Sequence, residues 1–523
     1  MSFAARLSLS VLSGVLLALC FPPFDLPWLV WLSLLPLMAA LWVGKPLRAR
    51  TGFILGYSTG SAFFLIGMFW LRHVTALGTV LAALYLAVYF GLWGLFAAAV
   101  ARGRSPDSPS ERAISIFLSA AAWTGIEWLR GMGPAGFGWN GLGVPLGKWP
   151  VIAQAADVIG VFGLSFMVVA VQAAGFCIAR GARGSAGLRR VVRLALSLAL
   201  IAGAAGYGWW RINELQKEGA TISLSTALVQ PNLPQEIKSD ADNLESVAKT
   251  LSDLSDSRLK QGALDLLVWP ESALPAVFSD NYAQTFLAHV LGRGDFTLIS
   301  GMDEQEMKTY YNSVIIAHRD ISRAQVQRKV HLVPFGEYLP FRPVFGYFEF
   351  ITRQLPGDFD AGESTEPVRL PEHPISIIPL VCFEDTFGRI ARKFVRPEPQ
   401  LLVNVTNDAW FRDSGEADQH AASAAFRCIE LRRPMIRAAN TGRTCVIDQF
   451  GRITHRIPRL QEGVLSADVA IPTHGRVTVY ARFGDWFAVI SLLLALIATL
   501  HAAVRRKSPR NEPRSPAVAT PPQ

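Results

Sequence analysis

The chain has few charged residues and no closely spaced cysteine pairs. Only 17% of its 523 residues are Asp, Glu, Lys or Arg, about half are apolar, and 14 are tryptophan. This balance favours an integral membrane protein over a soluble enzyme of the same length. The five cysteines show no C-x-x-C spacing, which argues against a disulfide framework and against a zinc site.

The net charge of +9 is unevenly distributed. The basic residues gather between apolar segments and in the C-terminal tail, so they indicate membrane orientation and not nucleic-acid binding. Eight apolar stretches are long enough to cross a bilayer. They lie near residues 5–21, 27–44, 52–71, 76–101, 113–130, 158–179, 191–210 and 484–504.

Orientation follows from four basic clusters, which come after the second, fourth, sixth and eighth stretches. The positive-inside rule then places both termini in the cytoplasm and the block between stretches seven and eight in the periplasm of a Gram-negative cell. The predicted domains are a seven-helix membrane domain at 1–215, a periplasmic domain at 220–472, an eighth helix at 484–504 and a disordered cytoplasmic tail at 505–523.

Two other interpretations of the apolar stretches are weaker. The first stretch can be taken for a signal peptide with a lipoprotein cleavage box before Cys20, but Leu19 is too large and another stretch follows almost at once. We therefore predict an uncleaved helix. A transporter would carry more charges within its spans or an inverted repeat, and neither is evident.

The block at 220–472 alternates short apolar runs with helical stretches, which predicts an α/β domain with strands buried on both faces. The clearest predicted strands are 223–229, 263–269, 296–300, 313–317, 375–381 and 401–405.

Three motifs of this block carry reactive side chains. Glu271 and Cys382 each follow a strand-like run, and Lys329 begins the segment Lys-Val-His-Leu-Val-Pro-Phe-Gly-Glu, which ends at Glu337. Taken singly, Glu271 can be a loop glutamate or a helix cap, Lys329 a solvated charge, and Cys382 an inert buried thiol. Together, a carboxylate, an ammonium group and a thiol can serve as base, electrostatic stabiliser and nucleophile.

The order and contexts of these three residues resemble the Glu-Lys-Cys site of the nitrilase superfamily. Joined to membrane spans, they resemble the apolipoprotein N-acyltransferase family, and the segments at 21–24, 127–131 and 160–166 are similar to its membrane domain. The resemblance implies an α-β-β-α sandwich, with Glu271 as base, Lys329 as oxyanion stabiliser and Cys382 as nucleophile. Glu337 would orient the lysine or the attacking amine.

Further positions take their expected roles from the same resemblance. The backbone N–H of Phe383 would join the oxyanion site, and Glu384 matches a retained carboxylate. Two departures stand out: Phe383 replaces a tyrosine common in the family, and Ser239 stands where tryptophan is common. His420 in a Cys-His pair is an alternative that the Glu-Lys-Cys set makes unnecessary.

An aromatic arm at 340–359 lies beside the Lys329 motif. It can be a helix packed on the core, or a lid that enters the membrane interface and covers an acyl chain. We expect Glu127 and Arg130, which lie near a span end, either to form an ion pair with each other or to contact a lipid headgroup. Candidate lid or substrate residues are Phe345, Tyr347, Phe348 and Trp410.

The resemblance implies transfer of a fatty acyl group from a glycerophospholipid to the N-terminal amine of a diacylglyceryl-cysteine apolipoprotein. The expected mechanism is ping-pong through a thioester on Cys382, without metal or other cofactor. Membrane lipids would be partners, nucleic acid would not, and the protein would be a monomer. A membrane-tethered amidase or nitrilase that hydrolyses a lipid-linked amide is the main alternative. A catalytically inactive lipid-binding scaffold is a second, although it would not need all three groups.

Overall fold

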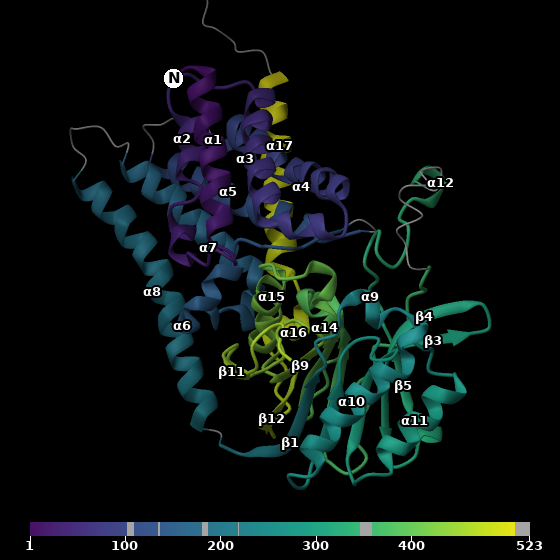
Figure 1. Cartoon of the computed structure of the whole chain (residues 1–523). Helices are drawn as coiled ribbons and strands as arrows, with labels where there is room; N and C mark the ends of the chain where they lie inside the picture. Colours follow the sequence, from purple (N-terminus) through teal and green to yellow (C-terminus); the bar gives the residue numbers. More distant parts are fainter. Residues whose placement is uncertain (102–108, 134–135, 180–186, 218, 346–357, 508–523) are drawn as a thin grey trace, which may run out of the picture.

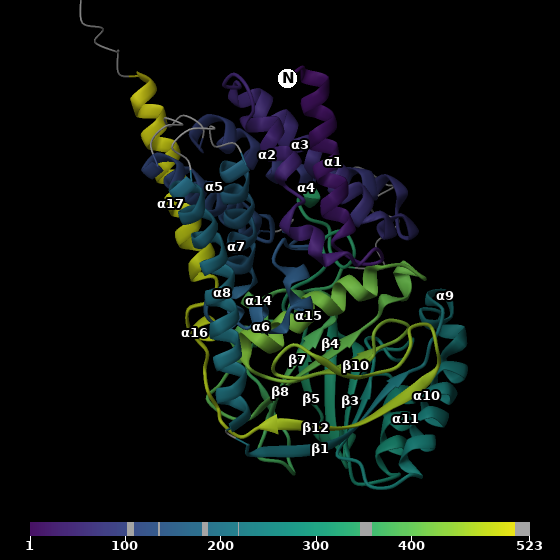
Figure 2. The same ribbon diagram turned by 90° about the vertical axis from the view of Figure 1, so that its left-hand side faces the viewer.

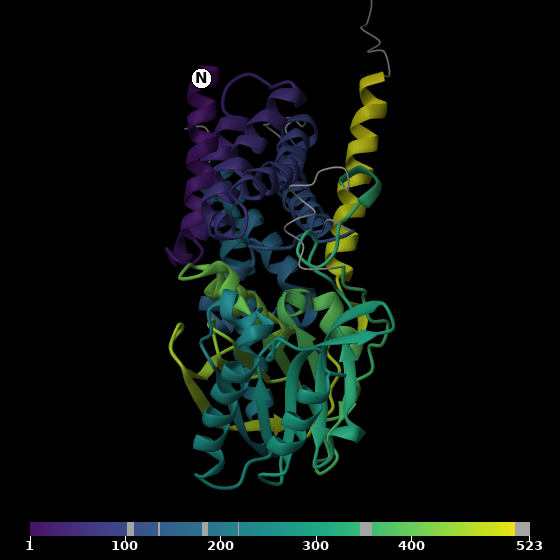
Figure 3. The same ribbon diagram turned by 45° about the vertical axis from the view of Figure 1, so that its right-hand side comes forward.

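A bundle of long helices stands above a β-rich part in the computed structural model (Figure 1). The structure describes residues 1–523 except 102–108, 134–135, 180–186, 218, 346–357 and 508–523. The N-terminus and the C-terminal end of α17 (Trp486–Lys507) lie at the end of the bundle that is farthest from the β-rich part (Figures 1 and 3).

Helices occupy all eight of the predicted apolar stretches. Within the described residues, three of them are long and apolar enough to cross a membrane: Ala76–Val100, Ala156–Ile178 and Trp486–Val504. The elements, besides α17, are α1 (Phe3–Leu19), η1 (Pro27–Trp31) with α2 (Leu35–Trp42), α3 (Ala49–Gly67), α4 (Ala76–Phe96) with η3 (Ala97–Ala101), α5 (Pro109–Arg130), α7 (Ala156–Ala179) and α8 (Gly187–Lys217).

Small residues bring α3 and α4 into close contact. A Cβ added at Gly52 would lie 2.4 Å from the carbonyl oxygen of Gly94, and one at Gly56 would lie 2.2 Å from that of Phe90. Glycine at these positions lets the two backbones approach, as is common where helices pack within membranes.

Two six-stranded sheets form the β-rich part. The first has the order β12-β1-β2-β3-β4-β5 and the second the order β11-β10-β9-β8-β7-β6. The strands of the first sheet are β12 (Gly463–Pro472), β1 (Thr221–Gln230), β2 (Leu266–Trp269), β3 (Thr297–Glu306), β4 (Thr309–His318) and β5 (Gln325–Arg328). Those of the second are β11 (Ile453–Arg456), β10 (Cys445–Ile447), β9 (Met435–Ala439), β8 (Gln400–Thr406), β7 (Ser376–Val381) and β6 (Val368–Arg369). All six predicted strands are present.

Alternating side chains of the strands build a four-layer sandwich. In β2, Leu266 and Val268 join a core shared with β7 and β8, whereas Leu267 and Trp269 pack with α10 (Leu244–Leu259) and α11 (Asn281–Leu291). The outer face of the second sheet packs on α15 (Glu416–Leu431). This two-residue alternation gives the expected α-β-β-α arrangement and confirms the fold class of this part.

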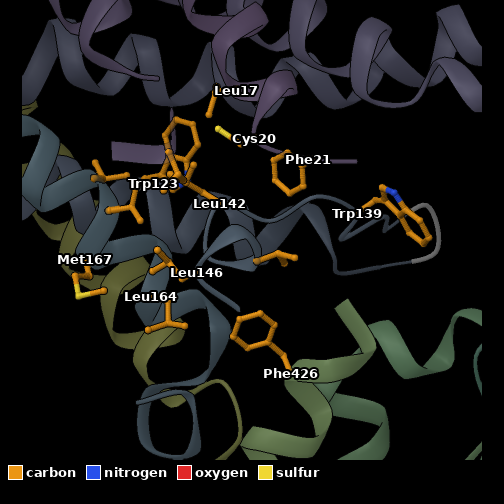
Figure 4. Close-up of a cluster of buried hydrophobic side chains, with 14 of the residues drawn as sticks. Leu17, Cys20, Phe21, Trp123, Trp139, Leu142, Leu146, Leu164, Met167 and Phe426 are labelled. Atoms are coloured by element: carbon orange, nitrogen blue, oxygen red, sulfur yellow. The ribbon is translucent and has the colours of Figure 1, made fainter. Parts of the chain in front are cut away.

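The helix α15 lies between the second sheet and the helical bundle (Figure 2), and its side chains join the two. Phe426 extends from α15 into the apolar core of the bundle, near Leu146 and Leu164 (Figure 4). At the C-terminal end of α15, Arg432 forms a buried ion pair of 2.8 Å with Asp157 of α7.

One side chain of α15, Gln419, makes five hydrogen bonds to the bundle. Its Oε1 accepts from the indole N–H of Trp70 (3.1 Å), from that of Trp139 (2.7 Å) and from Nδ2 of Asn140 (3.1 Å). Its Nε2 donates to the carbonyl oxygens of Pro22 (2.6 Å) and Gly67 (3.0 Å). Because Gln419 is 1% exposed, these bonds fix the sandwich against the bundle at one buried point.

Candidate active site

Cys382 lies at a sharp turn where β7 ends. Its φ of +52° is in the left-handed region, and it begins the short helical turn η7 (Cys382–Thr386). A non-glycine residue adopts this conformation only where its surroundings hold it, and Nδ2 of Asn404 donates 2.8 Å to the Cys382 carbonyl oxygen. The turn leaves Cys382 partly exposed.

Burial and the nearby Glu271 raise the pKa of the Cys382 thiol, and the positive charge of Lys329 opposes them. The resting thiol is therefore protonated at neutral pH, and a base would be needed to form the thiolate that a nucleophilic role requires.

Glu271 follows β2 and is 8% exposed. The next residue, Ser272, has a φ of +42°, so this strand also ends in a left-handed turn. A Cβ at Gly301 of β3 would lie 2.4 Å from the Glu271 Cα, so glycine is required where β3 passes the carboxylate. Burial raises the pKa of Glu271 above its usual value; Lys329 opposes this effect and Glu337 adds to it. A carboxylate with a raised pKa suits a general base.

Lys329 is fully buried between two carboxylates. Its Nζ donates 2.8 Å to Oε1 of Glu337 and lies 3.8 Å from Oε1 of Glu271. Burial alone would lower the pKa of Lys329, but Glu337 and Glu271 outweigh it and raise the pKa. The lysine therefore keeps its charge, with Glu337 as its close partner and Glu271 left less tightly paired.

Asn312 of β4 also links the two carboxylates. Its Nδ2 donates 2.8 Å to Oε1 of Glu271 and 2.9 Å to Oε1 of Glu337, and its backbone carbonyl oxygen accepts from the Lys329 backbone N–H at 2.8 Å. Sequence reasoning missed this residue. The local signal was weak: Asn312 is one of two polar residues that precede the apolar run of β4.

Glu384 holds the cysteine turn against the lysine segment. Its Oε1 accepts from the backbone N–H groups of Val330 (2.8 Å) and His331 (2.9 Å), and its Oε2 accepts from that of Val381 (2.8 Å). Glu337 acts similarly within its own loop, because its Oε2 accepts from the Val333 N–H at 2.8 Å. The two glutamates thus fix the backbone on either side of the reactive groups.

Phe383 belongs to a group of rings, stacked on His331 and Phe137 and edge-to-face with Phe387. Its ring lies 5.6 Å from that of His331, 5.0 Å from Phe387 and 6.3 Å from Phe137, which comes from the bundle. The Phe383 N–H lies in the first turn of η7, where backbone N–H groups have no acceptor within the helix. Such an N–H is suited to an oxyanion site.

The lid candidates are only partly described. Phe345 ends α12 (Arg342–Phe345), which stands apart from the sandwich at the level of the bundle (Figures 1 and 3). Tyr347 and Phe348 lie outside the described residues. Trp410 is 42% exposed, and its neighbour Phe411 packs edge-on against Trp70 at 4.7 Å.

Ser239 is exposed and ends α9 (Gln235–Lys238), where its hydroxyl donates 2.8 Å to the Gln235 carbonyl oxygen.

His420 is buried in a charged network and is 1% exposed. Its Nε2 lies 2.8 Å from Asp385, its Nδ1 lies 3.2 Å from Asp408, and Nη2 of Arg437 lies 2.6 Å from Nδ1. Ligand atoms of Asp408, Glu416 and His420 lie within 4.8 Å of one another. The Arg437 guanidinium supplies the positive charge among these carboxylates, so the cluster fits a structural network better than a metal site.

The sandwich belongs to the carbon-nitrogen hydrolase class, since the family model described as carbon-nitrogen hydrolase matches residues 225–477. The model described as the apolipoprotein N-acyltransferase N-terminal domain matches residues 13–174. Apolipoprotein N-acyltransferase of Geobacter metallireducens is 35% identical over 521 residues, covering 96% of this chain and 95% of its own. That of Rhodopseudomonas palustris is 32% identical over 531 residues, covering 96% of each. The chain belongs to the apolipoprotein N-acyltransferase family.

Proposed function

We propose that this protein transfers a fatty acyl group from a glycerophospholipid to the α-amino group of the N-terminal diacylglyceryl-cysteine of an apolipoprotein, which completes lipoprotein maturation. One observation carries the proposal: in a member of this family, Lys329 is buried between Glu271 and Glu337, and Glu384 ties the segment after Lys329 to the turn that carries Cys382.

In the first half-reaction, Glu271 accepts the proton of the Cys382 thiol and the thiolate attacks the acyl ester carbonyl. The ammonium group of Lys329 and the Phe383 N–H stabilise the tetrahedral oxyanion. As the C–O bond breaks, Glu271 returns the proton to the leaving alkoxide. A lysophospholipid departs, and the acyl group remains as a thioester on Cys382.

In the second half-reaction, the amine of the diacylglyceryl-cysteine attacks the thioester. Glu271 accepts the amine proton, Lys329 again stabilises the oxyanion, and the thiolate leaves and is protonated as the amide forms. Water must be kept away from the thioester meanwhile. We expect aromatic residues to cover the acyl chain, with Phe345, Tyr347, Phe348 and Trp410 as the candidates. The position of α12 at the level of the helical bundle supports this role for Phe345 (Figures 1 and 3).

The bundle would cross the bacterial inner membrane eight times, with both termini cytoplasmic and the catalytic domain at 220–472 periplasmic. The helices in all eight stretches support this topology, as does the position of the N-terminus and of the C-terminal end of α17 far from the sandwich (Figure 1). The membrane domain at 1–215, the helix at 484–504 and the tail at 505–523 complete the proposed domains, and the functional unit would be a monomer.

The proposal is tested by supplying an acceptor that can or cannot form an amide. Purified protein is incubated with a glycerophospholipid and a synthetic peptide that begins with diacylglyceryl-cysteine, and the matched control peptide has an acetylated N-terminus. We expect N-acyl peptide and lysophospholipid in equal amounts, and no transfer to the acetylated peptide. Release of free fatty acid at the same rate with either peptide would instead support the hydrolase alternative.

A further inference from the structure

Arg130 ends α5 as a buried cation without an ion pair among the described residues. It is 2% exposed, and its Nε and Nη2 have no hydrogen-bond partner. Glu127, one turn earlier, is bonded to other groups. Its Oε2 accepts from the indole N–H of Trp123 (2.9 Å) and from the Leu142 N–H (3.0 Å), and its Oε1 from the Ser165 hydroxyl (2.6 Å). The ion pair that the sequence allowed between Glu127 and Arg130 is therefore not formed.

A buried guanidinium is costly unless acceptors surround it. The Phe64 ring lies 5.1 Å from the Arg130 guanidinium carbon and offers a cation–π contact, but a ring face does not accept hydrogen bonds as an anion does. Arginine presents its N–H groups in a planar fork that matches a phosphate. The unsatisfied donors therefore point to an anionic ligand with oxygen acceptors.

The pocket that contains Arg130 has mostly apolar walls. Leu17, Phe21, Trp123 and Leu142, which line it, gather in one region of the bundle (Figure 4). A small hydrated anion alone would gain little from such walls, whereas a ligand with an acyl chain would bury apolar surface there. The chemistry of the pocket fits an anionic group joined to an apolar chain.

We propose that Arg130 binds the phosphate of the glycerophospholipid acyl donor. This inference rests on the proposed function and assigns a headgroup site within it. In the proposed topology, Arg130 lies at the periplasmic end of α5, at headgroup depth. Its carbonyl oxygen accepts from the Phe137 N–H at 2.8 Å, and the Phe137 ring stacks near Phe383, the residue after Cys382. The backbone of Arg130 is thus linked through Phe137 to the turn that carries Cys382.

The test measures binding in a Cys382→Ala background, in which no acyl transfer occurs. Delipidated protein in detergent is titrated with a glycerophospholipid, with the diacylglycerol of the same acyl chains, and with inorganic phosphate, and complexes are counted by native mass spectrometry. Arg130→Gln is added to the background. The matched control is Arg72→Gln, because Arg72 is an exposed arginine of the same half of the protein.

We expect Arg130→Gln to weaken phospholipid binding on the order of 10- to 100-fold, the range for lost hydrogen bonds to a charged group, and to leave diacylglycerol binding unchanged. Arg72→Gln should leave both unchanged. Equal phospholipid binding with and without Arg130, or parallel loss of both lipids, would overturn the proposal. If inorganic phosphate bound as tightly as the glycerophospholipid, and if its binding also depended on Arg130, the site would be a site for free anions. That result would overturn the assignment to a lipid. Since no turnover is measured, failure of the acyltransferase function would be seen separately, as missing transfer by the wild type.

Discussion

Glu337→Gln removes one of the two negative charges beside Lys329 without changing the shape of the side chain. In the native site, Oε1 of Glu337 accepts from Lys329 and Asn312, and Oε2 accepts from the Val333 N–H. An amide has one oxygen, so in either orientation its NH₂ faces at least one of these donors. The substitution therefore costs at least one charge-assisted or backbone hydrogen bond. Among the described residues, it leaves Glu271 as the remaining carboxylate in ion-pair range of Lys329.

Two effects can be estimated from the geometry. Oε1 of Glu271 and Oε1 of Glu337 both accept a hydrogen bond from Nδ2 of Asn312, so these two oxygens are at most about 5.7 Å apart. At an effective dielectric constant of about 20, the repulsion between the two carboxylates is then on the order of 3 kcal/mol. Losing this repulsion makes Glu271 a weaker base. In the proposed mechanism, a charge-assisted hydrogen bond orients Lys329 toward the oxyanion, so its loss raises the activation free energy and slows acylation by about 10- to 100-fold.

The assay is single-turnover acylation of Cys382 by a glycerophospholipid, followed by intact-protein mass spectrometry from about pH 4 to 9. In the wild type, the rate rises with pH as Glu271 ionises, with a midpoint above the usual value because burial raises its pKa. In Glu337→Gln the midpoint moves to lower pH, because the charge that raised it is gone, and the plateau falls.

Glu306→Gln is the matched control, since Glu306 pairs with Arg328 on the exposed rim of the same sheet, where ion pairs contribute little. An unchanged plateau in Glu337→Gln, or a midpoint that moves to higher pH, would refute this account of Glu337.

The remaining predictions concern two residues that the structure adds to the site and to its support. Asn312→Leu should move the midpoint of the acylation rate to higher pH, opposite to Glu337→Gln, because the hydrogen bond from Asn312 lowers the pKa of Glu271. The same series of single-turnover rates from about pH 4 to 9 measures this midpoint. A shift to lower pH would contradict the role of Asn312 as a hydrogen-bond donor to Glu271. Gln419→Glu keeps an acceptor for Trp70, Trp139 and Asn140 but sets an oxygen against the carbonyl oxygens of Pro22 and Gly67. It should destabilise the junction by about 2 to 6 kcal/mol, seen as a lower thermal midpoint in detergent, whereas an unchanged midpoint would mean that the junction does not depend on these bonds.

Local patterns predicted an α/β domain, whereas the four-layer arrangement and the roles of Glu271, Lys329 and Cys382 were expected only from the resemblance to the nitrilase superfamily. Each of the six predicted strands is a short apolar run; Cys382 directly follows one of them and Glu271 follows another after Pro270, so their positions at strand ends can be read from the sequence. The end of α8 was less predictable. The apolar stretch stops near residue 210, but the helix continues to Lys217 because Arg211 pairs with Asp157 and Glu214, and Glu214 with Arg476.

Asn312 and Gln419 could not be predicted, because their partners are distant in sequence. Asn312 reaches a carboxylate 41 residues away, and Gln419 donates to a carbonyl 397 residues away. A single polar residue in a strand or helix has no periodic signal that identifies such a partner. The role of Asn312 appears only when β2, β4 and β5 are placed in one sheet, and that of Gln419 only when α15 packs on the bundle.

The central claim is that Cys382 carries the acyl group. The most direct measurement is intact-protein mass spectrometry after incubation with a glycerophospholipid and no acceptor, comparing wild type, Cys382→Ala and the matched control Cys177→Ala, whose cysteine lies in α7. The account predicts a hydroxylamine-sensitive acyl adduct on wild type and Cys177→Ala, and none on Cys382→Ala. An adduct that persists in Cys382→Ala, or lipid that binds the wild type and stays unmodified, would contradict it.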